Sequence, residues 1–160
     1  METQFAYGSN MDVERLKDDD KGGIVRILEN ARRAFLDGWE FGFTKKSRDG
    51  SGKANIIQKT GSIVWGLLLE LDSDAVTWMD KSEGINNEIP DYTKKPVEVR
   101  TDDGREHECW VYVANSVPEK FDEKGVPPWS AYLGHVVKGA EDFHLPPEYI
   151  ERIRNTPTKD

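Results

Sequence analysis

One stretch of the chain, residues 62–71, constrains the fold more than any other. It reads Ser-Ile-Val-Trp-Gly-Leu-Leu-Leu-Glu-Leu and is the most apolar run in the sequence. Apolar residues at consecutive positions are typical of a strand that is buried on both faces, because a half-buried strand would alternate with polar residues. Gly66 within the run indicates a bulge or the close approach of another segment. The run therefore predicts an interior strand.

Further strands are predicted on both sides of this run. Residues 38–43 alternate aromatic side chains with Glu40 and Gly42, which indicates a strand. Residues 54–57 form a second short strand, and the polar, Gly-rich residues 44–53 are expected to be a mobile loop.

An Asp-Gly pair at 103–104 predicts a β-hairpin. Strand 96–101, with Val97 and Val99 on one face, leads into the pair, and strand 106–114 returns from it. We expect the hairpin to join the same sheet as the apolar strand.

Helices are expected where capping residues or prolines precede a mixed apolar pattern. The first expected helix runs from Asp12, its N-cap, to about Lys17, and the second is capped by Asp72 or Ser73 and ends near Ser82. The third is opened by Pro127-Pro128, is about ten residues long and has Gly139 as its C′ residue, and the fourth starts near Pro146-Pro147. Residues 18–23 are predicted to be a surface loop, residues 25–35 are ambiguous between strand and helix, and the tail 155–160 is expected to be frayed.

Composition limits the partners and the compartment. A formal net charge of −8 argues against nucleic acid or an anionic membrane as the main partner, because like charges repel. The single cysteine, Cys109, excludes an internal disulfide and suits a reducing compartment. No apolar run approaches about 18 residues, and the N-terminus lacks the features of a signal peptide. We therefore expect a cytoplasmic protein with no membrane partner.

Residues 5–11, Phe-Ala-Tyr-Gly-Ser-Asn-Met, predict a strand, a tight loop and a helix. Phe5 and Tyr7 alternate as in a strand, and the three small residues 8–10 interrupt it. Such a loop directs several backbone N–H groups at one spot beside a helix N-terminus, which can bind an anion. Gly8 allows a positive φ and the close approach of a ligand. An ordinary first turn would give the same pattern, so spacing alone leaves both interpretations open.

Glu83 and Tyr132 are the side chains most suited to chemistry. Glu83 follows a predicted helix, at a junction where a carboxylate can point into a cleft with apolar walls. Desolvation there would raise its pKa and suit it to proton transfer near neutral pH. The alternatives are a solvated surface glutamate and, for Tyr132, a core aromatic whose hydroxyl is satisfied.

The histidines and the cysteine do not suggest a metal site or a covalent nucleophile. His107, His135 and His144 lack metal-ligand spacing, and Cys109 with His107 alone is too small a set for zinc. The i, i+2 spacing of Cys109 and His107 on one strand suits packing better than attack. We therefore expect no metal.

Taken together, the motifs resemble the γ-glutamylcyclotransferases, whose fold is also called AIG2-like. The resemblance covers residues 4–153 and rests on Phe5-Ala6-Tyr7-Gly8-Ser9-Asn10-Met11, Val64-Trp65-Gly66-Leu67, Ser82-Glu83-Gly84, Pro127 to Tyr132, and Gly139-Ala140 through Leu145-Pro146-Pro147-Glu148-Tyr149. The Tyr-Gly-Ser-Asn loop is similar to that of γ-glutamylcyclotransferase proper, whereas the γ-glutamylamine branch typically has Tyr-Gly-Thr-Leu and the glutathione-specific branch differs as well.

The resemblance implies a small α+β fold, a mixed β-barrel of about five to seven strands flanked by helices. It implies one domain over residues 1–160, with a core at about 4–153. The implied reaction cleaves a small γ-glutamyl amide into 5-oxoproline and a free amine, with no metal or organic cofactor, and the family is compatible with a homodimer. Carried over to this sequence, the implied site comprises Glu83 as acid/base and Tyr7, Gly8, Ser9, Asn10, Tyr92 and Tyr132 as substrate-binding residues.

The segment from Gly84 to Tyr92 is about two residues longer than the family pattern. It contains Glu88 and Asp91, which we expect near the pocket mouth, where their carboxylates would favour a cationic, polyamine-like leaving amine. Three hypotheses remain open: a cyclotransferase for small γ-glutamyl peptides or amines, an enzyme that removes a γ-glutamyl protecting group from a specialised amine metabolite, and a non-catalytic binding protein. Retention of Glu83 argues against the last, because a binding protein has no chemical need for that carboxylate.

Overall fold

A computed structural model describes residues 1–19, 27 and 31–160, and the described strands close into a barrel. Its strands are β1 (Glu2–Ala6), β2 (Arg32–Lys46), β3 (Gly52–Leu71), β4 (Tyr92–Thr101) and β5 (Glu106–Ala114). They follow one another around the barrel in the order β1-β3-β2-β4-β5. Strands β1 and β5 meet in parallel, and the other described pairs are antiparallel. The predicted mixed barrel in an α+β fold is confirmed.

The apolar run forms the second half of β3 and lies inside the barrel wall. Three successive residues, Leu67, Leu68 and Leu69, are at most 1% exposed, so both faces of the strand are covered. Strand β1 pairs along one edge of this segment and β2 along the other. A Cβ atom added to Gly66 would lie 2.3 Å from the carbonyl oxygen of Ala6, which confirms the expected close approach.

The mobile loop expected at residues 44–53 is wrong at both of its ends, where residues 44–46 and 52–53 are strand. Strand β2 continues to Lys46 and β3 begins at Gly52, so only the turn between them remains, and 54–57 is part of β3. The polar side chains are used inside the barrel: Asn55 Nδ2 donates to Thr44 Oγ1 at 2.9 Å, and Asn55 Oδ1 accepts from the Ala114 N–H at 2.9 Å. A polar composition here therefore reflects internal hydrogen bonding.

The hairpin is confirmed, with β4 paired to β5 from Tyr92 to Arg100, although β4 begins earlier than the predicted strand. The described helices are α1 (Val13–Asp19), α2 (Ser73–Ser82), α3 (Ser130–Asp142) and α4 (Pro147–Arg154), and Ser9–Met11 forms a 3-10 turn, η1. Asp12 and Asp72 cap α1 and α2 as predicted, since their carboxylates accept from the N–H groups of Arg15 and Ala75. None of the described helices is long and apolar enough to cross a membrane.

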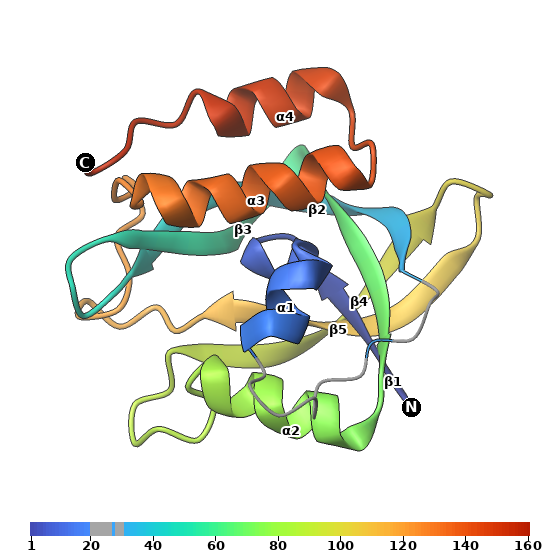
Figure 1. The fold of residues 1–160 in the computed structure, drawn as a ribbon, viewed down its shortest axis with the longest axis horizontal. Coiled ribbons are helices and arrows are strands. Elements are labelled where there is room, and N and C mark those ends of the chain that lie inside the picture. Colours follow the sequence, from blue (N-terminus) through green and yellow to red (C-terminus); the bar gives the residue numbers. More distant parts are fainter. Residues whose placement is uncertain (20–26, 28–30) are drawn as a thin grey trace.

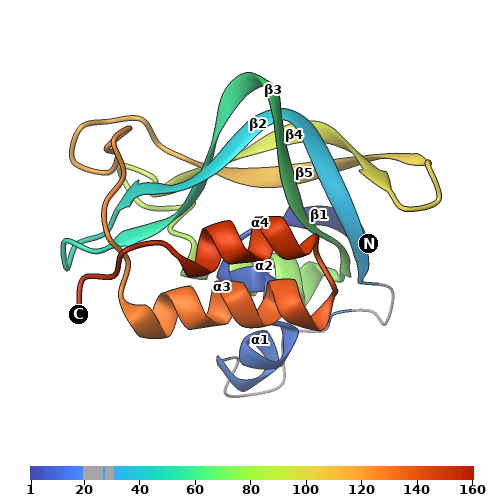
Figure 2. The same ribbon diagram turned by 90° about the horizontal axis from the view of Figure 1, so that it is seen from above.

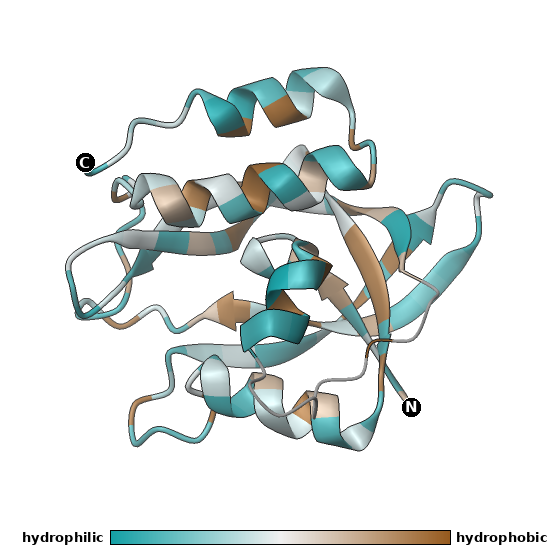
Figure 3. Ribbon diagram, viewed as in Figure 1, coloured by the Kyte–Doolittle hydropathy of each residue, from teal (hydrophilic) through white to brown (hydrophobic). Residues whose placement is uncertain are grey.

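The helices surround the barrel unevenly. Helices α3 and α4 lie side by side and antiparallel along one side, α2 lies at the opposite end, and α1 lies between them (Figures 1 and 2). Figure 3 shows hydrophobic colour on the strands through the middle of the molecule, whereas α1 is largely hydrophilic. The core therefore lies within the barrel and under α3 and α4, and α1 faces solvent on its outer side.

Two predictions for α3 and one for the C-terminal tail need correction. Pro127-Pro128 does not open α3, because the Pro127 carbonyl accepts from the Gly52 N–H at 3.0 Å and holds the segment extended against β3. Gly139 is not a C′ residue, since the helix continues to Asp142. The tail is not frayed: Asp160 Oδ1 accepts from the Ser130 N–H at 2.8 Å.

Two other segments are described only in part. Asp18 and Asp19 of the predicted surface loop 18–23 are helical, and the rest of that loop lies outside the described residues. Within the ambiguous stretch 25–35, residues 32–35 belong to β2, and residues 25, 26 and 28–30 lie outside the described residues.

Candidate active site

A cavity of about 680 Å³ opens between the end of β1, the end of α2 and the start of α3. It is lined by all of the residues that the sequence resemblance assigned to a site, namely Tyr7, Gly8, Ser9, Asn10, Glu83, Tyr92 and Tyr132. These residues come from four separate segments of the chain, and the barrel and its helices bring them together.

Glu83 lies directly after α2 as its C-cap residue. Its N–H donates to the Met79 carbonyl at 2.8 Å, which fixes the backbone, and its Oε1 accepts from Asn10 Nδ2 at 3.2 Å. Burial raises the pKa of Glu83 above the ordinary value, although Asn10 and the cations Arg15 and Lys45 act in the opposite direction. Such a carboxylate can take up and return a proton near neutral pH.

Gly8 of the loop is the N-cap of η1, and Ser9 and Asn10 form its first part. The N–H groups of Met11 and Asp12 donate back to the carbonyls of Gly8 and Ser9. Among the described residues, no backbone carbonyl accepts from the N–H groups of residues 8–10, so these donors remain available to a ligand. The φ of Gly8 is −111°, so the glycine is not needed for a positive φ. A Cβ at this position would lie 2.8 Å from the Ala54 Cβ, so close packing against β3 requires it.

The three tyrosines bond to the backbone of the cavity wall. Tyr7 and Tyr92 donate to the carbonyls of Tyr112 and Ala54 at 2.6 and 2.8 Å. The Tyr132 hydroxyl instead accepts from the Ala54 N–H at 3.0 Å, which leaves its own proton available. Burial raises the pKa of Tyr132 to about 12, so the hydroxyl stays protonated at neutral pH. Tyr7 and Tyr92 therefore shape the cavity, and Tyr132 can also donate into it.

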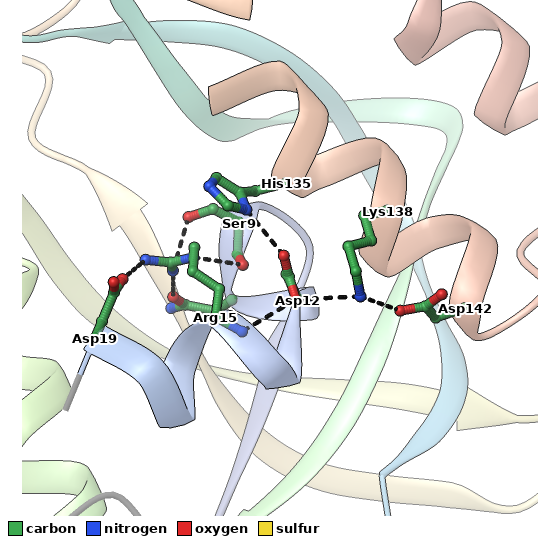
Figure 4. A network of polar contacts seen from close by, with 8 residues as sticks. Ser9, Asp12, Arg15, Asp19, His135, Lys138 and Asp142 are labelled. Atoms are coloured by element: carbon green, nitrogen blue, oxygen red, sulfur yellow. Dashed lines mark hydrogen bonds and ion pairs between the residues drawn. The ribbon is translucent and has the colours of Figure 1, made fainter. Parts of the chain in front are cut away.

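Arg15 is a site residue that sequence reasoning missed. In Figure 4 its guanidinium points back from α1 to the loop, where Nη2 donates to Asn10 Oδ1 at 3.1 Å and to Ser9 Oγ at 3.2 Å. Its other side pairs with Asp19. Because Arg15 holds the amide oxygen of Asn10, the amide NH₂ is directed at Glu83. A side chain three residues after an N-cap leans toward the helix N-terminus, and this spacing could have indicated Arg15.

The loop is also attached to α3. Asp12 is only 3% exposed. Its Oδ2 lies 2.9 Å from His135 Nδ1, and its Oδ1 lies 3.6 Å from Lys138 Nζ (Figure 4). Burial alone would raise the pKa of Asp12, but the contacts with His135, Arg15 and Lys138 outweigh it and lower the pKa. The loop is therefore held between α1 and α3.

We expect the substitution Arg15→Met to reduce turnover without unfolding the protein. The Asn10 amide would lose its fixed orientation, and a displacement of about an ångström at a reacting group costs up to about 100-fold in rate. Turnover and thermal melting of the same variant provide the measurement. Lys17→Met, on the exposed face of the same helix, is the control and should leave turnover unchanged; an Arg15→Met protein as active as the parent would contradict the role assigned to Arg15.

The two acidic residues of the segment from Gly84 to Tyr92 differ in their position relative to the cavity. Asp91 lines the cavity as expected, but its Oδ1 accepts from Lys45 at 3.0 Å and from Lys120 at 2.6 Å. Burial alone would raise the pKa of Asp91, and these two ammonium groups lower it instead. Glu88 is exposed and does not line the cavity. Neither residue offers a free carboxylate at the cavity, which the idea of a cationic leaving amine requires.

Comparisons with known proteins agree with this arrangement. Residues 63–153, which include Glu83, Tyr92 and Tyr132, match the model of the AIG2-like family. The chain is 27% identical over 150 residues to a γ-glutamylcyclotransferase of Mus musculus and 28% identical over 151 residues to one of Homo sapiens, and each alignment covers 94% of this chain and 76% of the relative. A solved structure of a γ-glutamyl cyclotransferase superimposes with a TM-score of 0.81 at 25% identity, over 99% of this chain and 89% of the other. The resemblance seen in the sequence is thus confirmed, and the chain belongs to the AIG2-like family.

Proposed function

We propose that the protein is a γ-glutamyl cyclotransferase, an enzyme that converts a γ-glutamyl amide into 5-oxoproline and a free amine. The observation that carries the proposal is the bond between Asn10 and Glu83. It places a half-buried carboxylate of raised pKa inside one cavity, beside a loop whose backbone N–H groups donate to no described backbone carbonyl. The relatives that bear the name γ-glutamylcyclotransferase support the same reaction.

The reaction needs a base that can afterwards act as an acid. The α-ammonium of the glutamyl group is not nucleophilic until it loses a proton, and the Glu83 carboxylate takes that proton. The free amine attacks the γ-carbonyl carbon and forms the ring C–N bond. Glu83 then returns the proton to the leaving nitrogen as the amide C–N bond breaks. The ring nitrogen releases its second proton to water, and the departing amine is protonated by water.

The remaining cavity residues hold the substrate in a folded conformation. Intramolecular attack gains on the order of 7–11 kcal/mol when the reacting atoms are well oriented. The N–H groups of residues 8–10 are suited to the glutamyl carboxylate or to the oxyanion of the tetrahedral intermediate, where one donor contributes about 3 kcal/mol. Tyr132 can supply a further hydroxyl donor. No covalent enzyme intermediate is required.

The test is release of 5-oxoproline from a set of γ-glutamyl compounds incubated with the purified protein. We expect stoichiometric 5-oxoproline and free amine, with no product from the corresponding α-glutamyl compounds, whose carbonyl cannot close the same five-membered ring. Binding of γ-glutamyl compounds without release would instead support a binding protein. Inactivity toward every compound, together with an absence of binding, would contradict both.

A further inference from the structure

The cavity contains one ammonium group, that of Lys53, which forms no ion pair with a described carboxylate. Arg15 pairs with Asp19, and Lys45 pairs with Asp91. Lys53 Nζ has no hydrogen-bond or ion-pair partner within residues 1–19, 27 and 31–160. The charged residues that line the cavity are Arg15, Lys45, Lys53, Asp19, Glu83 and Asp91.

This charge is held at an unfavourable position. Lys53 on β3 is directly opposite Lys45 on β2, and like charges opposite one another destabilise a sheet. Asp91 neutralises Lys45 but is shared with Lys120, so it is not available to Lys53. Burial lowers the pKa of the Lys53 ammonium, Asp49 and Glu83 raise it, and Arg15 and Lys45 lower it further. An anion brought into the cavity would remove this cost.

The ammonium is placed beside the substrate-binding residues. Lys53 Nζ lies 4.0 Å from the centre of the Tyr132 ring, and the next residue, Ala54, bonds through its N–H and C=O to Tyr132 and Tyr92. Contact with an aromatic face positions a cation without using its N–H donors. All three donors of the half-buried ammonium therefore remain available to a ligand in the cavity.

We propose that Lys53 is a specificity-determining residue that binds a carboxylate on the leaving amine. This inference rests on the proposed function. The α-amine of the glutamyl group has to reach Glu83, which Asn10 ties to the loop, so the glutamyl end occupies that part of the cavity. Lys53 belongs to neither the loop nor the Glu83 network and meets the other end of the substrate. The enzyme then prefers γ-glutamyl compounds whose leaving amine carries a negative charge over those with a neutral or cationic amine, the reverse of a preference for polyamine-like groups.

Two substrates that differ only in this charge test the assignment: γ-glutamyl-alanine and its C-terminal amide, γ-glutamyl-alaninamide. In Lys53→Met, which keeps the aliphatic stem, we expect KM for γ-glutamyl-alanine to rise about tenfold or more, the effect of losing a charged hydrogen bond. The KM for the amide should stay within about twofold of the parent value, and kcat for both should change little. Lys53→Arg should restore most of the preference. The control is Lys59→Met, on the same strand, where the lysine pairs with Glu40 and does not line this cavity.

The outcomes separate this proposal from the reaction itself. An equal rise in KM for both substrates would mean that Lys53 binds the glutamyl carboxylate, and unchanged KM values would mean that it only packs on Tyr132; either result overturns the assignment. A parent protein that releases no 5-oxoproline from either compound overturns the proposed function instead. Calorimetric binding of both compounds to Glu83→Gln, with and without Lys53→Met, provides the same comparison without turnover.

Discussion

Replacing Glu83 with glutamine is expected to lower turnover by roughly 100-fold or more, the usual scale of lost acid–base catalysis. Glutamine keeps the size of the side chain and an oxygen that can accept from Asn10, but it cannot take a proton from the α-ammonium. A γ-glutamyl ligand should still bind. Glu83→Asp should recover little activity, because a side chain shorter by one methylene moves the carboxylate by about an ångström. Rates of 5-oxoproline release measure both effects.

The same variant should be at least as stable as the parent at neutral pH. Because burial raises the pKa of Glu83, the folded protein binds more protons than the unfolded chain, and the free energy of unfolding falls as pH rises from the ordinary pKa through the raised one. Glutamine does not titrate, so this residue adds no pH dependence to the free energy of unfolding of the variant. Any advantage of the variant over the parent in melting temperature should therefore vanish below the ordinary pKa of glutamate. Glu88→Gln, an exposed position outside the cavity, is the matched control. A fully active Glu83→Gln protein would refute the acid–base role.

Replacing Gly139 with alanine is expected to destabilise the protein and also to reduce activity. A Cβ at this position of α3 would lie 2.5 Å from both the carbonyl carbon and the Cβ of Met11. The backbone of η1 would have to move, and such overpacking typically costs about 1–3 kcal/mol or more. Because Met11 directly follows the loop at residues 8–10, the displacement would also alter the cavity. Thermal melting and 5-oxoproline release measure the two effects.

The same helix offers a control of opposite sign. Gly134 is exposed, and a Cβ added to it meets no heavy atom within 4 Å. Gly134→Ala should therefore stabilise the protein by up to about 1 kcal/mol through helix propensity alone. If Gly139→Ala raised the melting temperature as Gly134→Ala does, the contact between α3 and η1 would not be the tight packing described here.

The interior strand, the hairpin and the capped helices were predictable because each depends on a local pattern. Leu67 to Leu69 are apolar in succession, Asp103-Gly104 makes a turn, and aspartates precede α1 and α2. The continuation of β2 to Lys46 and the start of β3 at Gly52 were not predictable, because polar side chains there form hydrogen bonds with partners that are distant in the sequence. Thr44 meets Asn55, and Asn55 meets the backbone of Ala114.

The members of the candidate site were predictable from motifs, but its electrostatics were not. No local pattern shows that Asp91 forms ion pairs with Lys45 and Lys120, or that Lys53 lies opposite Lys45. Composition suggested an acidic environment, since the whole chain carries a net charge of −8. The distribution of that charge depends on the tertiary structure, which brings Arg15, Lys45 and Lys53 to the cavity together with Asp19, Glu83 and Asp91.

The parallel contact between β1 and β5, at Gln4 and Trp110, has a consequence for how the protein acquires its structure. Among the described residues, β1 pairs with β3 and β5, which lie much later in the chain, and folds dominated by such distant contacts form slowly. While the chain is being made, the Tyr7 hydroxyl lacks its acceptor, the Tyr112 carbonyl, until β5 has emerged, and the cavity lacks Tyr132 until α3 has emerged. The cavity should therefore be among the last features to form during synthesis or refolding, and the slowest refolding phase should be the one in which enzymatic activity returns.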